Sequence, residues 1–121
     1  MTGIGVDLCS IERFIRLKED THFLQRIFTP SEIEYCQKKK KSEECFAVRF
    51  AAKEAFMKAL GTGYAKGVSF KEIEIVKDEN GQPSIKLNGL TNEIYIKSGA
   101  SKVMLSLSHE RQMAIAMVFI E

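Results

Sequence analysis

Residues that could bind an anionic ligand lie close together in the stretch RFAAKEAFMKALGTG, which runs from Arg49 to Gly63. On a helix that advances about 100° per residue, Glu54 and Lys58 are one turn apart and share a face, whereas Arg49 lies roughly 140° around from Glu54. Glu54 and Lys58 can therefore contact one ligand together, but Arg49 can reach that ligand only from a second copy of the chain. The alternative interpretation is an ordinary Glu–Lys pair that stabilises the helix.

A second carboxylate stands in an apolar segment near the N-terminus. In GIGVDLCSI, apolar residues at positions 4, 6 and 8 alternate with Gly5 and Asp7, which predicts a strand with Asp7 on the face opposite the apolar one. Mg²⁺ is commonly held by one or two carboxylates, with substrate phosphates and waters completing its shell. Asp7 and Glu54 are therefore candidate ligands of a hard cation.

Two further segments could contribute groups to an anion site. In ALGTGYAKG, glycines including Gly61 and Gly63 allow close approach of the backbone to a phosphate, although the residue order of a Walker A loop is absent. In SLSHE, Ser108 and His109 at a predicted strand end could direct hydroxyl and imidazole donors at an anion, and a structural histidine is the alternative. A Ser/His/Asp hydrolase is disfavoured because no G-x-S-x-G elbow is present.

Capping signals and periodicity locate the helices that must position these residues. Ser10 can cap a helix over IERFIRLKED, in which Phe14 and Ile15 face the core while Arg13 and Arg16 form a basic surface stripe.

A second helix begins in FTPSEIEYCQ, where Thr29 and Glu32 make a capping box around Pro30. It ends in the lysine run 38–41, for which a solvated charge run is the default interpretation. A long helix then runs from Ser42 to about Leu60 and stops at the glycine that follows.

Beyond this helix the apolar period changes to two. FKEIEIVKDENGQPSIKL predicts two strands around a turn at Asn80 and Gly81, and KVMLSLSHERQMAIAMVFI predicts a final hairpin. TNEIYIKSGA fits either a short helix stopped by Gly99 or a strand. The order of elements predicts an α+β domain, in which an early strand and helices, including one long central helix, pack on a mainly antiparallel sheet.

Length and composition limit the class of protein. The 121 residues, 45% hydrophobic and 28% charged, predict one globular domain spanning residues 1–121. No apolar run approaches the roughly 20 residues needed to cross a bilayer, so we expect a cytoplasmic protein without a membrane partner. Cys9, Cys36 and Cys45 are odd in number and widely spaced, which predicts reduced, mostly packed thiols. The net charge of +2 and a pI near 8.4 favour an acidic or phosphorylated partner over nucleic acid.

Taken together, the segments GIGVDL, RIFTPSE, RFAAKEAFMKALGTG, NGQPSI and SLSHE, in this order, closely resemble the holo-[acyl-carrier-protein] synthases, the short branch of the 4'-phosphopantetheinyl transferases. The resemblance covers nearly the whole chain. It implies transfer of 4'-phosphopantetheine from coenzyme A to a serine of apo acyl carrier protein, which leaves 3',5'-ADP, in support of fatty acid biosynthesis. It also implies the transferase-like α+β fold and a homotrimer with active sites between subunits.

The resemblance further implies roles for individual residues. Asp7 and Glu54 would bind Mg²⁺ on the coenzyme A diphosphate, and Lys58 with the backbone of residues 61–63 would contact the ligand from the same subunit. The neighbouring subunit would supply three phosphate ligands, with Pro83 near the adenine; the three are Arg49, Ser108 and His109. The proton of the carrier serine could go to Glu54, to a metal-bound water or to His109.

A basic surface stripe is the expected docking site for the carrier protein. Acyl carrier proteins are acidic, so Arg13 and Arg16, extended by Lys18 and Arg26, form the expected docking surface.

One rival function is a noncatalytic coenzyme A or nucleotide binding module, which the two carboxylates disfavour because a pure anion binder gains nothing from aiming negative charge at phosphates. The other is a nucleic-acid binder, which the lack of aromatic residues interleaved with the basic ones disfavours.

Overall fold

The computed structural model describes residues 1–63 and 67–121, so the segment 64–66 of the glycine loop lies outside the described residues. Its five strands are β1 (Gly3–Ser10), β2 (Ile73–Lys77), β3 (Pro83–Leu87), β4 (Val103–Glu110) and β5 (Met113–Ile120). Its helices are α1 (Arg13–Leu17), α2 (Thr21–Ile27), α3 (Pro30–Gln37), α4 (Ser42–Leu60) and α5 (Gly89–Lys97), and a 3₁₀ turn, η2 (Phe70–Glu72), precedes β2.

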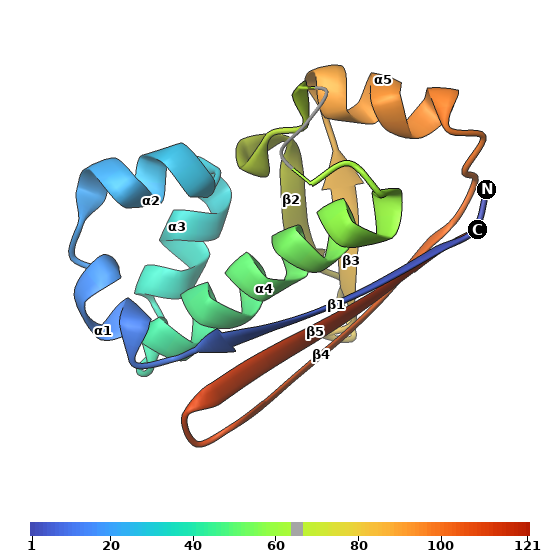
Figure 1. Ribbon diagram of the computed structural model, residues 1–121. Helices are drawn as coiled ribbons and strands as arrows, with labels where there is room; N and C mark the ends of the chain where they lie inside the picture. Colours follow the sequence, from blue (N-terminus) through green and yellow to red (C-terminus); the bar gives the residue numbers. More distant parts are fainter. Residues whose placement is uncertain (64–66) are drawn as a thin grey trace.

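Two antiparallel sheets flank the long helix α4. The larger sheet has the strand order β1-β5-β4, and β2 pairs with β3 in a separate hairpin. Figure 1 shows α4 lying along the larger sheet, with α1 to α3 gathered near its first turns and α5 near its other end. The chain has the predicted α+β fold, and the last predicted hairpin forms β4 and β5.

Helix α4 is the centre of the core. Most of its residues are buried, including Phe46 and Phe56, and its C-cap Gly61 has φ 83°, a left-handed conformation that glycine adopts without strain. Strand β1 lies directly on this helix, because a Cβ at Gly5 would stand 2.1 Å from the carbonyl oxygen of Ala55. A glycine is therefore needed at this position to bring β1, and with it Asp7, up to the helix.

A buried ion pair ties α3 and the β2–β3 hairpin to α4. The predicted capping box is confirmed: Thr29 Oγ1 accepts from the Glu32 backbone, and Glu32 Oε1 accepts from the Thr29 backbone at 2.9 Å. Glu32 also accepts from Lys53 Nζ at 2.7 Å and from the Ile75 backbone at 2.8 Å. Lys53 is fully buried and donates to the carbonyls of Phe70 and Ile73 as well. Glu32 is thus both a cap residue and the partner of a buried lysine.

The N-terminal helical region differs from its prediction. Strand β1 extends through Ser10, which therefore caps nothing, and α1 begins only at Arg13. A separate helix, α2, follows with Asp20 accepting from the Phe23 backbone as its cap. Phe14 is buried as predicted, but Ile15 is 54% exposed, so it does not face the core. The segment 91–100, which fitted either structure, begins within helix α5.

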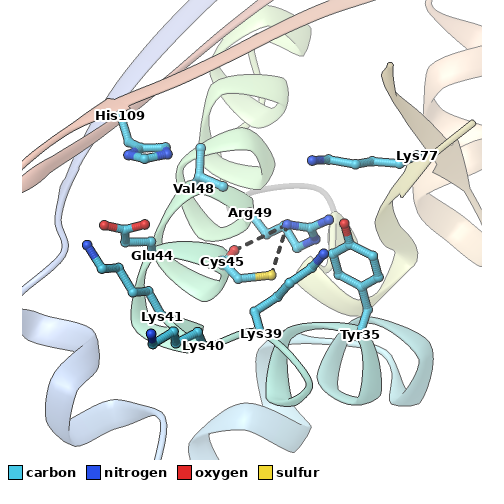
Figure 2. A pocket seen from close by; sticks show the side chains of 10 residues that line it. All are labelled: Tyr35, Lys39, Lys40, Lys41, Glu44, Cys45, Val48, Arg49, Lys77 and His109. Carbon is cyan, nitrogen blue, oxygen red and sulfur yellow. Dashed lines mark hydrogen bonds between the residues drawn. The ribbon is translucent and has the colours of Figure 1, made fainter. Parts of the chain in front are cut away.

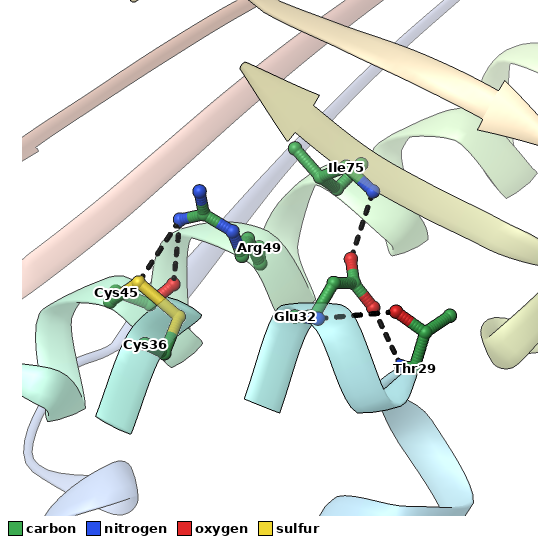
Figure 3. The surroundings of a disulfide bond; sticks show 6 residues. All are labelled: Thr29, Glu32, Cys36, Cys45, Arg49 and Ile75. Atoms are coloured by element: carbon green, nitrogen blue, oxygen red, sulfur yellow. Dashed lines mark hydrogen bonds between the residues drawn. A yellow bond between two sulfur atoms is a disulfide. The ribbon is translucent and has the colours of Figure 1, made fainter. Parts of the chain in front are cut away.

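The cysteines are packed as predicted, since all three are buried, but the prediction that they are reduced is wrong for two of them. Cys36 in α3 and Cys45 in the first turns of α4 form a disulfide with a Cα–Cα distance of 5.4 Å, while Cys9 is free and buried. The two residues are nine positions apart in the sequence, and the turn between α3 and α4 brings them together (Figure 3). Spacing alone could not reveal a pairing that depends on how two helices meet.

The apolar face of β1 points away from α4. Asp7 lies on the helix side of the strand, whereas Ile4, Val6 and Leu8 are exposed on the opposite side. Strand β5 pairs with β1 on one side and β4 on the other, which places further exposed apolar residues on the same side of the sheet, which we call the outer face; they are Met104, Met113, Ile115 and Met117. Contiguous apolar surface of this kind marks an interaction site in a folded protein.

Candidate active site

Asp7 and Glu54, the carboxylate pair, meet where β1 crosses α4. Lys58 joins them: its Nζ donates to Asp7 Oδ1 at 2.8 Å and to the Val6 carbonyl at 3.0 Å. The pKa of Glu54 is raised to about 7, chiefly by burial and also by hydrogen bonding with Asp7 and the charge of Asp7, while the charges of Lys58 and Arg13 act in the opposite direction. The hydrogen bond to Asp7 raises the pKa of Lys58. Two carboxylates held this close favour a bound proton or a cation.

The second cluster of predicted residues lies around Arg49. Arg49 and His109 line a basic pocket of about 410 Å³ that α3, the 38–41 segment, α4, β2 and β4 surround (Figure 2). The residues of the basic pocket are Tyr35, Lys39, Lys40, Lys41, Glu44, Cys45, Val48, Arg49, Lys77 and His109. None of the three residues of the carboxylate cluster, Asp7, Glu54 and Lys58, lines it.

Arg49 is held in place but not neutralised. It is 3% exposed, its guanidinium lies 4.6 Å from the ring centroid of Tyr35, and its Nη1 donates to the carbonyl and Sγ of Cys45. Within the described part of the chain Arg49 forms no salt bridge, and its buried Nε has no hydrogen-bond partner. Burial lowers the pKa of Arg49. An anion entering the pocket would find a desolvated, preoriented cation.

The cations of the basic pocket act on Tyr35 together. Desolvation raises the pKa of the phenol, but a hydrogen bond from Lys39 and the charges of Lys77, Lys39 and Arg49 outweigh it, so that the pKa of Tyr35 is lowered. The ammonium of Lys39 also stands 4.6 Å from the ring centroid. Tyr35 and Lys77 were not among the predicted site residues, because neither lies in a segment whose sequence indicates chemistry.

The remaining predicted residues lie at the edges of these two clusters. Gly61 ends α4 beyond Lys58, and Gly63 follows with φ 54°. Pro83 pairs across the hairpin with Lys77 of the basic pocket. Ser108 pairs with Ile115 on the outer face, whereas His109, the next residue, lies on the other side of β4. The structure therefore brings His109, but not the Ser108 side chain, to the pocket.

The predicted docking residues are exposed on α1 and α2. Arg13 stands over Phe50 at 5.8 Å from the ring centroid and lines a surface hollow together with Arg16. Arg26, exposed on α2, lines a second hollow that includes Phe50. Lys18 differs from them because it forms a salt bridge with Glu43 at 2.9 Å. Its charge is therefore committed to holding α1 against α4.

No group of three or more His, Cys, Asp or Glu side chains suited to a metal occurs among residues 1–63 and 67–121. The carboxylate pair is thus a two-ligand arrangement, which suits a cation that also binds a substrate. No helix in the described part of the chain is both long enough and apolar enough to span a membrane.

Comparison with known proteins identifies the family. Residues 3–118 match the model of the 4'-phosphopantetheinyl transferase superfamily. A holo-[acyl-carrier-protein] synthase of Geotalea daltonii is 51% identical, over 98% of this chain and 97% of its own.

Solved structures agree with this assignment. A Neisseria meningitidis holo-[acyl-carrier-protein] synthase superimposes with a TM-score of 0.90 at 40% identity, covering 98% of this chain and 97% of that one. The Helicobacter pylori synthase in complex with coenzyme A gives a TM-score of 0.85 at 35% identity, covering 98% and 99%. The chain belongs to the 4'-phosphopantetheinyl transferase superfamily, in the branch of the holo-[acyl-carrier-protein] synthases.

Proposed function

We propose that this chain transfers 4'-phosphopantetheine from coenzyme A to a serine hydroxyl of apo acyl carrier protein, within fatty acid biosynthesis in the cytoplasm. The observation that carries the proposal is the division of charge across α4: a carboxylate pair with a lysine in one place and a pocket of cations in another. Coenzyme A presents a diphosphate and a separate 3'-phosphate, so two such clusters match its two anionic groups. A noncatalytic binding module would use the cations but not the carboxylates.

The reaction needs positioning and charge neutralisation more than covalent help from the protein. The carrier's serine oxygen forms a bond to the phosphorus that bears pantetheine, and the bond from this phosphorus to the bridging oxygen breaks to release 3',5'-ADP. Lys58, whose ammonium contacts Asp7 of the carboxylate pair, would bind the oxygens that gain charge. Within one chain His109 lies in the basic pocket rather than beside Glu54, so we assign it to phosphate binding.

The carboxylate pair fits Mg²⁺. Its donors are oxygens, and Asp7 and Glu54 lie close enough for one to raise the pKa of the other, a repulsion that a divalent cation would relieve. Bound there, Mg²⁺ would neutralise charge on the diphosphate oxygens of coenzyme A. Lys58, which contacts Asp7, would then be released to the substrate phosphates.

We further propose that the site is completed by a second copy of the chain in a homotrimer. Glu54 and Arg49 lie on different faces of α4, and the outer face offers exposed apolar side chains on all three strands of the larger sheet. Covering that face with another subunit would bury them. One subunit would then supply the carboxylate pair and Lys58, and its neighbour the basic pocket.

The proposed carrier docking surface is the exposed arginine group of α1 and α2, namely Arg13, Arg16 and Arg26. These three side chains are solvent-exposed and form no salt bridge within the described residues. An acidic carrier would pair with them on approach, which raises the association rate and selects the partner. Lys18 is left out of this surface because Glu43 already neutralises it.

Intact mass of an apo acyl carrier protein tests the proposed reaction. The carrier is incubated with this protein and coenzyme A, with Mg²⁺ and with a chelator, and Glu54→Gln serves as the matched variant. We expect a gain of one phosphopantetheine, roughly 340 Da from its covalent formula, only with Mg²⁺ and only with the unaltered chain. Absence of this gain with several carriers and folded protein would favour the binding module.

A further inference from the structure

The disulfide between Cys36 and Cys45 lies at the wall of the basic pocket. Cys45 lines that pocket and Cys36 is fully buried behind it. The bond joins the last turn of α3 to the first turns of α4, and the lysine segment 38–41 is the connection between those helices. Figure 3 shows the bond beside the Arg49 guanidinium. A covalent link is therefore placed across the base of the segment that supplies three of the pocket's cations.

The disulfide also contacts the central cation of the pocket. Arg49 Nη1 lies 3.2 Å from Cys45 Sγ and 3.4 Å from the Cys45 carbonyl oxygen. Three weaker ties hold the same region: the Lys39 backbone N–H donates to the Cys36 carbonyl, the Glu44 backbone N–H donates to the Lys41 carbonyl, and Glu43 pairs with Lys18. These contacts do not require the S–S bond, so breaking it would remove the covalent restraint on the segment and leave the weaker ones.

We propose that Cys36 and Cys45 form a redox-responsive pair that couples thiol oxidation to the affinity of the basic pocket for a phosphorylated ligand. The proposal rests on the proposed function for the identity of that ligand. In a reducing compartment a disulfide is uncommon and, where present, is usually transient, catalytic or redox-sensing, which favours a switching role for this pair over a purely structural one. Oxidation would hold the lysine segment and Arg49 in the arrangement seen here, and reduction would leave the segment held only by the weaker contacts.

Glutathione disulfide is a sufficient oxidant. Cys45, the cysteine that borders the pocket among cations, attacks it as the thiolate and releases one glutathione, leaving a mixed disulfide. Cys36 then attacks Cys45 Sγ, forms the bond seen here and releases the second glutathione. The two thiols lose two protons and two electrons, and glutathione disulfide gains the electrons.

The test measures binding of 3',5'-ADP by calorimetry to the full chain after equilibration with glutathione disulfide or with dithiothreitol. Peptide mapping of each sample establishes whether Cys36 and Cys45 are joined. We expect the oxidised protein to bind roughly 3- to 10-fold more tightly, the effect of ordering one long side chain in advance. Cys36→Ser should bind like the reduced protein after dithiothreitol and should gain no affinity after glutathione disulfide, because its Cys45 can then form only a mixed disulfide with glutathione. Cys9→Ser, a matched control at a buried free cysteine, should respond like the unaltered chain.

Two results of these measurements would contradict the redox proposal. If the oxidised protein binds 3',5'-ADP equally or more weakly, oxidation is not coupled to the affinity of the pocket. If glutathione disulfide does not join the two cysteines, they are not a redox-responsive pair. The unaltered chain answers both questions even if Cys36→Ser fails to fold. Carrier modification by the reduced protein is measured in parallel. If the carrier is modified but binding of 3',5'-ADP does not depend on redox state, the redox proposal is wrong and the proposed function is retained. If the protein neither binds 3',5'-ADP nor modifies the carrier, the proposed function is wrong as well.

Discussion

Mixing two inactive variants tests whether the site is shared between subunits. Arg49→Met keeps most of the apolar stem of a buried side chain but removes its cation, and Glu54→Gln removes one member of the carboxylate pair. Each removes a group that would stabilise charge during phosphoryl transfer, so each homogeneous variant should lose roughly 100-fold or more in kcat.

The expected recovery follows from the arrangement of the two clusters. If sites are shared as proposed, each site in a randomly mixed ring would take its carboxylate pair from one chain and its basic pocket from the next. An intact site needs the Arg49→Met chain on the first side and the Glu54→Gln chain on the second. Each side holds the required chain with a probability of one half, so an equal mixture should recover about one quarter of the unaltered activity, whatever the number of subunits.

The assay is carrier modification followed by intact mass, after the two chains are unfolded together and refolded. As a matched control, a chain carrying both substitutions is mixed equally with the unaltered chain. A shared site then leaves about one quarter of the activity, whereas a site within one chain leaves about one half. No recovery in the first mixture and one half in the second, with mixed oligomers present, would refute the shared site.

Three further predictions concern stability, docking and pH. Lys53→Met should destabilise the fold by about 3–5 kcal/mol in urea unfolding, because it leaves Glu32 buried without its cation, whereas the exposed Lys38→Met should change it by less than about 0.5 kcal/mol. Similar values for both would contradict the buried pair. Arg13→Glu should raise KM for the carrier roughly tenfold at low salt and leave KM for coenzyme A unchanged; an unchanged carrier KM would exclude Arg13 from docking. Because the pKa of Glu54 is raised from 4.5 to about 7, its contribution to stability is full below pH 4.5 and is lost as pH rises toward 7 and above. At pH 8, Mg²⁺ should therefore raise the Tm of the unaltered chain but not that of Glu54→Gln; equal responses would count against the metal site.

Local signals in the sequence determined most of the elements. Some features depend only on residues that are close together in the chain, so spacing and turn chemistry predict them. They are the capping box at Thr29 and Glu32, the long helix that stops at Gly61 and the two hairpins. Glu54 and Lys58 belong to the same class, because one helical turn fixes their separation. The angle between Arg49 and Glu54 also follows from helix geometry alone.

Only the tertiary structure decided how these elements meet. Asp7 reaches Lys58 because Gly5 lets β1 lie against α4, and no local pattern states which strand approaches which helix. Tyr35 and Lys77 join the basic pocket from elements that are distant in sequence. The Cys36–Cys45 bond and the buried Lys53 likewise depend on α3 packing against α4. Periodicity identifies the faces of an element, but the partner of each face is set by packing of the whole chain.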